Sequence, residues 1–381
     1  MSYLTILLQR KIDRYLFSSL CSFFSIFKRE SVINKSSKVP DKNKIKKILV
    51  IKLWALGDSV VLLPTLAALK KQFPNAELHV LAHRRNKVVF EGQPFVDKII
   101  DFGVLNVLKL FRKYDICIDS EPALNVSAVI SFLASKNTVG FSHGTRAKLY
   151  SKTSLFNKTR HMVQNYLDLA RKIGVKYNTD RLIPIAVSEK EKYFVNEYFK
   201  KNKLSKNNFV VCIAPGVAES VKFRMWPIEN FAKLADELVK KYNAKIILVD
   251  TKMNENIINK IQSLMLEKSI NAVPEFGSFN KIKMTAELMK RCNVVISNDS
   301  GPMHISAAMG TKTLGLFGPN TPKLWAPYGK HNISIFKPKK GCPFMNNKNP
   351  ELMPRKLTHE QETCMDAITV EDVIKAVVRI K

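Results

Sequence analysis

The chain has 381 residues, of which 46% are hydrophobic, so its length and composition exclude a disordered protein and allow two globular domains. Its 62 Lys and Arg residues outnumber its 32 Asp and Glu residues, and the formal net charge of +30 favours a polyanionic partner. The lysines are scattered and no helix-turn-helix, zinc-finger or RNA-recognition signature is present, so we predict no nucleic-acid partner and favour an anionic membrane surface.

Residues 1–46 differ from the rest of the chain and form a basic N-terminal segment with a polar linker. Residues 15–27 (YLFSSLCSFFSIF) are an uncharged run flanked by Arg and Lys. This run is too short to span the roughly 30 Å hydrocarbon core of a bilayer. We interpret residues 1–30 as an amphipathic helix that lies either on an anionic membrane surface or on the core of the protein itself.

From residue 48 onward, apolar runs alternate with helical patterns. A strand over residues 48–53 and a helix over 60–73 place Asp58 where a strand meets a helix. A carboxylate at that point is either a helix cap or a group presented to a cleft. Further strands are predicted over residues 77–81, 96–101, 114–119 and 138–140, and further helices over 86–91, 104–112, 123–134 and 161–173. The alternation indicates a parallel sheet covered by helices on both faces.

The same alternation begins again after a charged helix predicted over residues 188–201. Strands are predicted over residues 209–214, 245–249, 293–297 and 313–317, and helices over 228–241, 254–268 and 370–380. Residues 215–220 form a turn-rich loop after the first of these strands, of the kind that binds phosphate. Two open α/β domains imply a ligand in the cleft between them.

Residues 298–304 (NDSGPMH) are the most informative stretch of the second half. They follow a buried strand and precede a helix of small residues, so Asp299, Ser300 and Gly301 lie at the carboxyl edge of a parallel sheet. The start of that helix offers unpaired N–H groups to a phosphate, and His304 follows one turn later. The alternative interpretation is an ordinary helix cap beside a buried histidine.

Cysteine spacing gives no evidence for a metal site. Cys117, Cys212 and Cys292 lie in apolar runs and no CxxC pair occurs, so we predict neither a zinc site nor another metal. Cys342 and Cys364 flank a C-terminal loop and could meet in space, although a reducing cytoplasm is the default environment.

Several motifs together resemble glycosyltransferase family 9, the heptosyltransferases of lipopolysaccharide core synthesis. The resemblance runs from Lys47 to the C-terminus. Its motifs are Ile51-Lys52 with Gly57-Asp58 and Pro64, Ala214-Pro215-Gly216 with Trp226-Pro227, and residues 298–304 with Phe317-Gly318-Pro319. Each motif alone would be weak, but their order and spacing are specific.

The resemblance implies a GT-B architecture, in which two Rossmann-like domains with parallel sheets face a central cleft. Residues 47–190 would then be the acceptor domain and residues 205–381 the nucleotide-sugar domain. The last helix, over residues 369–381, is expected to pack back on the N-terminal domain. The implied reaction moves a heptose from ADP-heptose to a lipid-linked glycan acceptor with inversion, without a cofactor or metal, at the inner face of the cytoplasmic membrane.

The resemblance also assigns roles to individual residues. Asp58 matches the general base, and Lys52 and Gly57 lie on the acceptor side. The positions that match the donor site are Pro215, Gly216, Lys222, Arg224, Asp299, Ser300, Gly301, Met303 and His304.

Two segments depart from the family pattern. Residues 250–255 (DTKMNE) replace a glycine-rich segment, and residues 121–127 lack a Gln-Gly and a basic residue. The nucleotide base and the acceptor therefore stay open. The alternatives are a transferase that uses another nucleotide sugar for O-antigen or capsule synthesis, and a non-catalytic protein that binds a nucleotide sugar or a polyanion.

Overall fold

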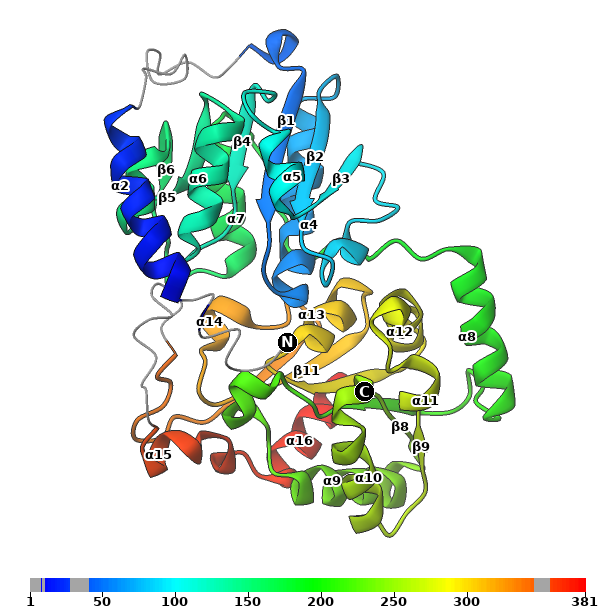
Figure 1. The fold of residues 1–381 in the computed structure, drawn as a ribbon. Coiled ribbons are helices and arrows are strands. Elements are labelled where there is room, and N and C mark those ends of the chain that lie inside the picture. Colours follow the sequence, from blue (N-terminus) through cyan, green and yellow to red (C-terminus); the bar gives the residue numbers. More distant parts are fainter. Residues whose placement is uncertain (1–7, 9–10, 28–40, 346–356) are drawn as a thin grey trace. The chain divides into compact units, whose positions relative to one another are not determined.

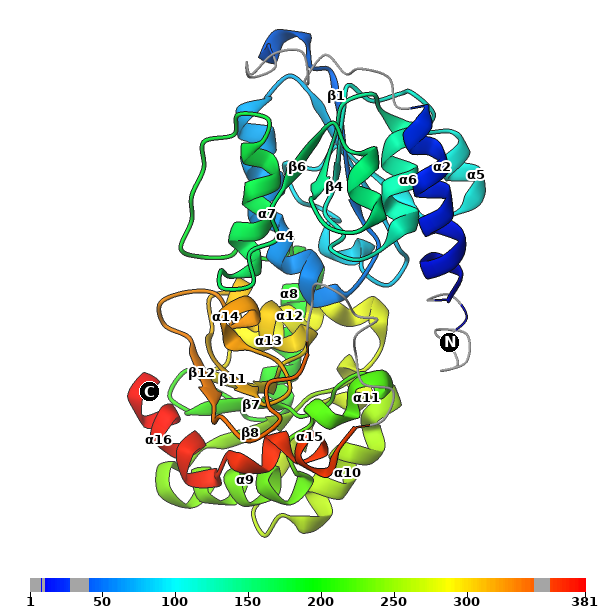
Figure 2. The same cartoon turned by 90° about the vertical axis from the view of Figure 1, so that its left-hand side faces the viewer.

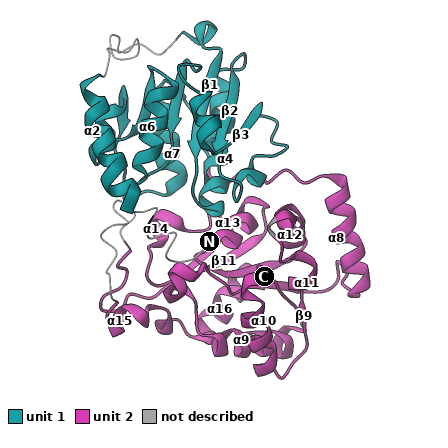
Figure 3. Cartoon of the chain, in the orientation of Figure 1, with its two compact units in different colours: residues 1–179, 347–350 teal, residues 180–346, 351–381 magenta. Residues whose placement is uncertain are grey.

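The computed structural model describes residues 8, 11–27, 41–345 and 357–381 (Figure 1). The described residues up to Thr179 form one compact unit and those from Asp180 onward form a second (Figure 3). Each unit contains one six-stranded sheet in which the paired strands are parallel. The predicted α/β class, with two parallel sheets, is confirmed.

The sheet of the first unit has the strand order β3-β2-β1-β4-β5-β6. Its strands are β1 (Lys47–Lys52), β2 (Glu77–Ala82), β3 (Lys98–Asp101), β4 (Ile116–Asp119), β5 (Thr138–Phe141) and β6 (Lys152–Ser154). The central strands β1 and β4 are almost fully buried, because helices cover both faces of the sheet.

Helices of the first unit form one layer on each face of this sheet (Figure 2). One layer holds α4 and α7, and the other holds α5, α6 and α2. The helices are η1 (Asp13–Phe17), α2 (Ser18–Ile26), η2 (Lys42–Lys44), α4 (Leu56–Gln72), η3 (Lys87–Val89), α5 (Val104–Leu108), α6 (Asn125–Ala134), η4 (Thr145–Leu149) and α7 (Met162–Arg171).

The described part of the N-terminal segment docks on its own unit. The carboxylate of Asp13 accepts hydrogen bonds from the N–H groups of Asn125 (3.0 Å) and Val126 (2.8 Å), and so caps α6. Cys21 on α2 is fully buried against α6 and η4, whereas the opposite side of α2 faces solvent. The helix thus binds the protein's own core, as one interpretation predicts, and still leaves a second face open.

The second unit has the strand order β12-β11-β10-β7-β8-β9. Its strands are β7 (Val210–Ala214), β8 (Lys245–Leu248), β9 (Ser269–Asn271), β10 (Val294–Asn298), β11 (Lys312–Phe317) and β12 (Ile333–Phe336). Its helices are α8 (Glu189–Lys201), η5 (Glu219–Arg224), α9 (Ile228–Tyr242), η6 (Lys252–Asn254), α10 (Glu255–Leu264), α11 (Val273–Phe276), η7 (Phe279–Lys281), α12 (Ile282–Lys290), α13 (Gly301–Ala308), α14 (Pro322–Trp325), α15 (His359–Glu362), η9 (Cys364–Ala367) and α16 (Val370–Ile380).

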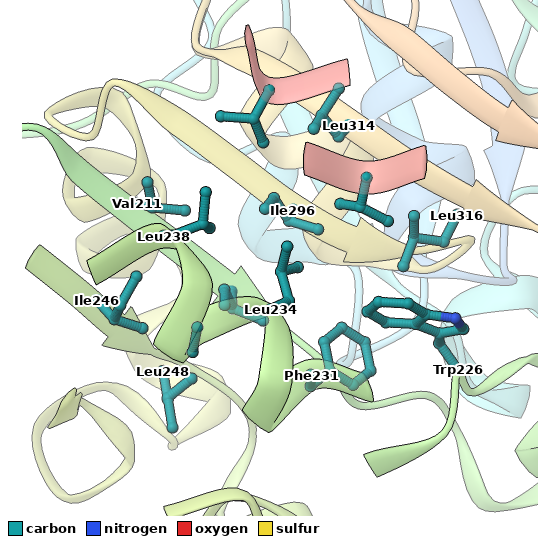
Figure 4. Packing of buried hydrophobic residues seen from close by; sticks show 14 of the residues in the cluster. Val211, Trp226, Phe231, Leu234, Leu238, Ile246, Leu248, Ile296, Leu314 and Leu316 are labelled. Carbon is teal, nitrogen blue, oxygen red and sulfur yellow. The ribbon is translucent and has the colours of Figure 1, made fainter. Parts of the chain in front are cut away.

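The core of the second unit lies between its sheet and helices α9 and α16. Trp226 and Phe231 are fully buried there, with their rings 5.0 Å apart at an edge-to-face angle (Figure 4). The apolar face of α16, with Val373 and Val377, packs on α9, β11 and β12. The packing of this helix against the N-terminal domain, which the family resemblance implies, stays a prediction.

Several elements differ from the sequence prediction. The helix expected from residue 60 begins at Leu56, so Asp58 lies in its first turn and not in a loop. The helices expected over residues 86–91 and 104–112 shorten to η3 and α5, and strands β6, β9 and β12 were not predicted. Cys342 and Cys364 do meet, and they form a disulfide bond.

None of the helices in the described part of the chain combines the length and the apolar character that a membrane span requires.

Candidate active site

In the first unit, the polar residues of interest lie where β1 ends and α4 begins. Asp58 is in the first turn of α4, and its side chain is 23% exposed. Ala55 just before the helix has φ of 60° and ψ of 133°, a conformation that costs free energy for a residue with a side chain. This strained turn lets the chain reverse sharply from strand to helix beside Asp58.

Lys52, the last residue of β1, is buried next to Asp58. Its Nζ lies 3.8 Å from Asp58 Oδ1 and 3.1 Å from the hydroxyl oxygen of Tyr166. Tyr166, on α7, donates its O–H to Asp58 Oδ1 over 3.3 Å. Burial and the nearby carboxylate of Asp58 hold the pKa of Tyr166 well above its usual value, so this hydroxyl stays a donor at neutral pH.

Glu121 holds Lys52 from the other side. Glu121 Oε1 lies 3.3 Å from Lys52 Nζ and accepts the N–H groups of Leu53 (2.7 Å) and Trp54 (2.9 Å). The side chains of Lys52 and Glu121 are only 1% and 3% exposed. The carboxylate therefore fixes both the lysine and the loop that leads to Asp58.

A second buried cluster supports the loop that carries Glu121. Asp119 Oδ2 accepts hydrogen bonds from Arg146 Nη2 (3.0 Å), Tyr150 (2.6 Å) and Ser127 (2.7 Å). Arg146 also donates to the carbonyl oxygen of Glu121. A buried carboxylate with several donors is rigid, because losing any of them would leave a polar group unsatisfied.

In the second unit, Asn298 joins two loops at the carboxyl edge of the sheet. Its amide nitrogen donates to the carbonyl oxygen of Pro215, and its side-chain oxygen accepts the N–H of Trp226 (3.1 Å). Next to Pro215, a Cβ on Gly216 would lie 1.9 Å from Asp250 Oδ2, so any other residue there would require the Asp250 side chain to shift.

Arg224 forms an ion pair with Asp299. Arg224 Nη1 lies 3.0 Å from Asp299 Oδ2, which also accepts a hydrogen bond from Asn320 Nδ2 (2.8 Å). The guanidinium remains 18% exposed, so a ligand can reach it. Lys222, in contrast, points its amino group at Glu219 (2.6 Å) on the exposed surface.

Helix α13 begins directly after Asp299. Ser300 is its N-cap residue, but its hydroxyl pairs with Ser297 (3.2 Å), and no side chain in the described residues caps this end. Gly301 is the first helical residue, and the helix start is a suitable place for an anion. The side chain of Met303 is fully buried and lies next to Gly315 of β11.

His304 is buried one turn into α13, and its ring lies 6.0 Å from that of Trp325. Burial, with a smaller effect of the Arg224 charge, lowers the pKa of His304 to about 4. The imidazole is therefore neutral at physiological pH. Its Nδ1 has no hydrogen-bond partner among the described residues.

The residues predicted from sequence thus lie in two groups, one in each unit. Lys52, Gly57 and Asp58 come together in the first unit. The donor residues come together along the edge formed by β7 and β10, apart from Lys222, which pairs on the surface, and Met303, which faces the core. In the described residues, no group of three His, Cys, Asp or Glu side chains could hold a metal ion.

Sequence reasoning missed three partners of these groups. Tyr166 and Glu121 contact Lys52, and Asn320 contacts Asp299. Asn320 had a usable signal, since it sits in a turn-rich loop directly after a buried strand. Tyr166 lies within a predicted amphipathic helix, and no sequence signal distinguished it from the other residues of that helix.

Two units, each with a parallel six-stranded sheet and polar groups at the carboxyl edge, have the architecture of the GT-B glycosyltransferases. The chain belongs to glycosyltransferase family 9 (heptosyltransferase), whose sequence model matches residues 108–352.

Several heptosyltransferases are similar to this chain in sequence or in fold over most of its length. Lipooligosaccharide heptosyltransferase 2 of Haemophilus ducreyi is 27% identical over 315 residues, which are 76% of this chain and 88% of that protein. A family 9 glycosyltransferase from Veillonella parvula has a similar fold, with a TM-score of 0.72 and 24% identity over 88% of this chain and 97% of its own. The structure of the E. coli ADP-heptose lps heptosyltransferase II is also similar, with a TM-score of 0.67 and 21% identity over 88% of this chain and 98% of that chain.

Proposed function

We propose that this glycosyltransferase moves a heptose from ADP-heptose to a sugar of the lipopolysaccharide core, with inversion at the anomeric carbon. The observation that carries the proposal is the partly exposed carboxylate of Asp58, held by buried Lys52 and Tyr166 at a sheet edge. Membership in the heptosyltransferase family and the similarity to named heptosyltransferases support the heptose and the core acceptor.

Asp58 acts as the general base in this proposal. It takes the proton of an acceptor hydroxyl while that oxygen attacks the anomeric carbon, so one C–O bond forms as the bond to the diphosphate breaks. A single displacement of this kind inverts the anomeric centre. The ammonium group of Lys52 lies 3.8 Å from the carboxylate and offers it a positive charge, and the hydroxyl of Tyr166 orients it.

The donor residues stabilise the leaving group. Arg224 and the N-terminus of α13, at Ser300 and Gly301, offer positive charge and N–H groups to the diphosphate as negative charge develops on it. The backbone at Pro215 and Gly216 forms the neighbouring wall, and the buried, neutral His304 lies one turn into α13. These side chains supply the electrostatic stabilisation that a metal ion gives in other transferases.

We place the enzyme at the inner face of the cytoplasmic membrane as a peripheral protein. A lipid-linked glycan acceptor lies at that surface, and residues 1–30 offer basic and apolar side chains toward anionic lipid. Residues 1–7, 9–10 and 28–30 lie outside the described part of the segment.

The test of the mechanism is Asp58→Asn, assayed with ADP-heptose and a heptose-deficient core acceptor. We expect turnover to fall about 10²–10⁴-fold with little change in donor affinity. Asp101→Asn is the matched control, because Asp101 is an exposed carboxylate of the same unit that pairs with Lys87. Near-normal turnover of Asp58→Asn would remove this carboxylate from the mechanism.

The identity of the nucleotide needs a separate measurement, because Asp250 occupies a segment that is glycine-rich elsewhere in the family. A thermal-shift panel of ADP, GDP, UDP and CDP should give a selective stabilisation by ADP. A selective shift with UDP or GDP would keep the transferase but replace the donor, as in O-antigen or capsule synthesis. Binding without any turnover would favour a non-catalytic nucleotide-sugar protein.

A further inference from the structure

Helix α5 and the turn after it present large apolar side chains to solvent. Val104, Leu105, Leu108 and Phe111 are 60–78% exposed. Their spacing places them on one side of this short segment, while Leu110 packs into the core under the sheet. A single exposed apolar residue needs no explanation, but four on one side form a patch.

Helix α2 has the same character on its outer side. Phe23, Ile26 and Phe27 are 53–78% exposed, whereas Cys21 and Phe24 pack toward α6. Both helices belong to the layer that covers one face of the sheet, and α6 lies between them (Figure 1). Two segments far apart in the sequence thus expose apolar side chains on the same side of the unit.

Ring contacts connect the two patches across α6. The ring of Phe24 lies 5.6 Å from that of Phe23 and 5.7 Å from that of Phe132 on α6. The guanidinium of Arg112 then lies 5.3 Å from the Phe132 ring and 5.8 Å from the Phe111 ring. We call the whole surface the apolar face; its residues are Phe23, Ile26, Phe27, Val104, Leu105, Leu108 and Phe111.

Basic side chains lie beside the apolar face. Lys109, Arg112 and Lys113 are exposed directly after α5, and Lys136 is exposed just after α6. The nearby carboxylate of Asp101 pairs with Lys87. Residues 102–114 contain no Asp or Glu. In the described N-terminal segment, Asp13 turns inward to cap α6. Cations around an apolar patch are the pattern of a protein that lies on an anionic bilayer.

We propose that the apolar face docks this enzyme on an anionic lipid bilayer, with α5 and the outer side of α2 inserted at the headgroup level. A second copy of the chain fits less well, because a symmetric contact would bring the same cations together. The inference rests on the proposed membrane location. It adds that α5 contacts the membrane together with the N-terminal segment. It does not depend on the transfer chemistry.

The test is sedimentation of the full chain with vesicles of phosphatidylcholine alone or with added phosphatidylglycerol. We expect binding that requires phosphatidylglycerol, and a loss of about a hundredfold or more in the variant with Leu105→Glu and Leu108→Glu, since burial of each leucine contributes about tenfold or more. Leu266→Glu, an equally exposed leucine of the second unit, should bind like the wild type. Equal binding by the double variant, or no binding by the wild type, would overturn the proposal.

A second variant measures insertion directly. Fluorescence of Phe111→Trp should be quenched by brominated acyl chains in anionic vesicles, whereas that of Leu266→Trp should not. Absence of quenching overturns the proposal. The proposal is also overturned if the wild type binds no vesicles but forms a dimer that the Leu105→Glu, Leu108→Glu variant does not form. Transfer to a water-soluble acceptor should be equal in wild type and double variant; this result separates lost docking from lost catalysis or lost folding.

Discussion

Replacing Lys52 by methionine would leave the buried carboxylate of Glu121 without the ammonium group that lies 3.3 Å away. Breaking a buried ion pair by removing one partner costs about 3–5 kcal/mol. Glu121 keeps the N–H groups of Leu53 and Trp54, so we expect the low end of this range, about 3 kcal/mol. For a unit of this size, that loss lowers Tm by about 6–12 °C.

Thermal unfolding followed by circular dichroism or calorimetry measures this effect. The variant with both Lys52→Met and Glu121→Gln should regain much of the lost stability, because it no longer buries a lone charge. The control is Lys87→Met, which breaks the exposed pair with Asp101 and should cost less than about 1 kcal/mol. A Lys52→Met protein that melts with the wild type, or a double variant no more stable than the single one, would refute the reasoning.

Three further predictions concern single side chains. Tyr166→Phe removes the O–H that contacts Asp58 and should lower kcat about tenfold with KM little changed. A lower melting temperature with unchanged kcat would mean that Tyr166 has a merely structural role. Since the pKa of His304 is about 4 in the folded protein and near 6.5 when unfolded, the unfolded chain binds more protons between these values. Stability should therefore fall by about 3 kcal/mol as the pH drops from 6.5 to 4, and His304→Gln, measured by denaturant unfolding at each pH, should lose this part of the slope. Gly216→Ala would place a Cβ against Asp250, and we expect weaker nucleotide binding in calorimetry; unchanged affinity would show that the loop is free to shift.

The alternation of strands and helices could be predicted from the hydrophobic pattern of the sequence, because buried parallel strands are continuous apolar runs. The helix at residues 370–380 was predicted to the residue. Short elements were missed for a physical reason. Strand β9, with three residues, carries too few side chains to show a period, and η3 replaces a helix where the chain turns after β2.

The candidate site was predictable only where its chemistry follows a strand directly. Asp58 and Asp299 each lie between a buried strand and the first turn of the next helix, and could be found in this way. Tyr166 contacts Asp58 across 108 positions of sequence, so no local pattern shows that contact. Likewise, Lys52 was assigned to the acceptor side, but its burial could not be predicted, because its partner Glu121 follows another strand.

Asn298 has a consequence for the way the donor residues respond to a ligand. Its side chain bonds both Pro215 and the N–H of Trp226, and Trp226 in turn donates its indole N–H to the carbonyl oxygen of Ile368 (2.9 Å). Three stretches of chain are therefore immobilised before a nucleotide arrives. Little conformational entropy is left for the ligand to remove on this side, so we expect the backbone amide of Trp226 to exchange slowly in the free enzyme and nucleotide binding to slow it little further.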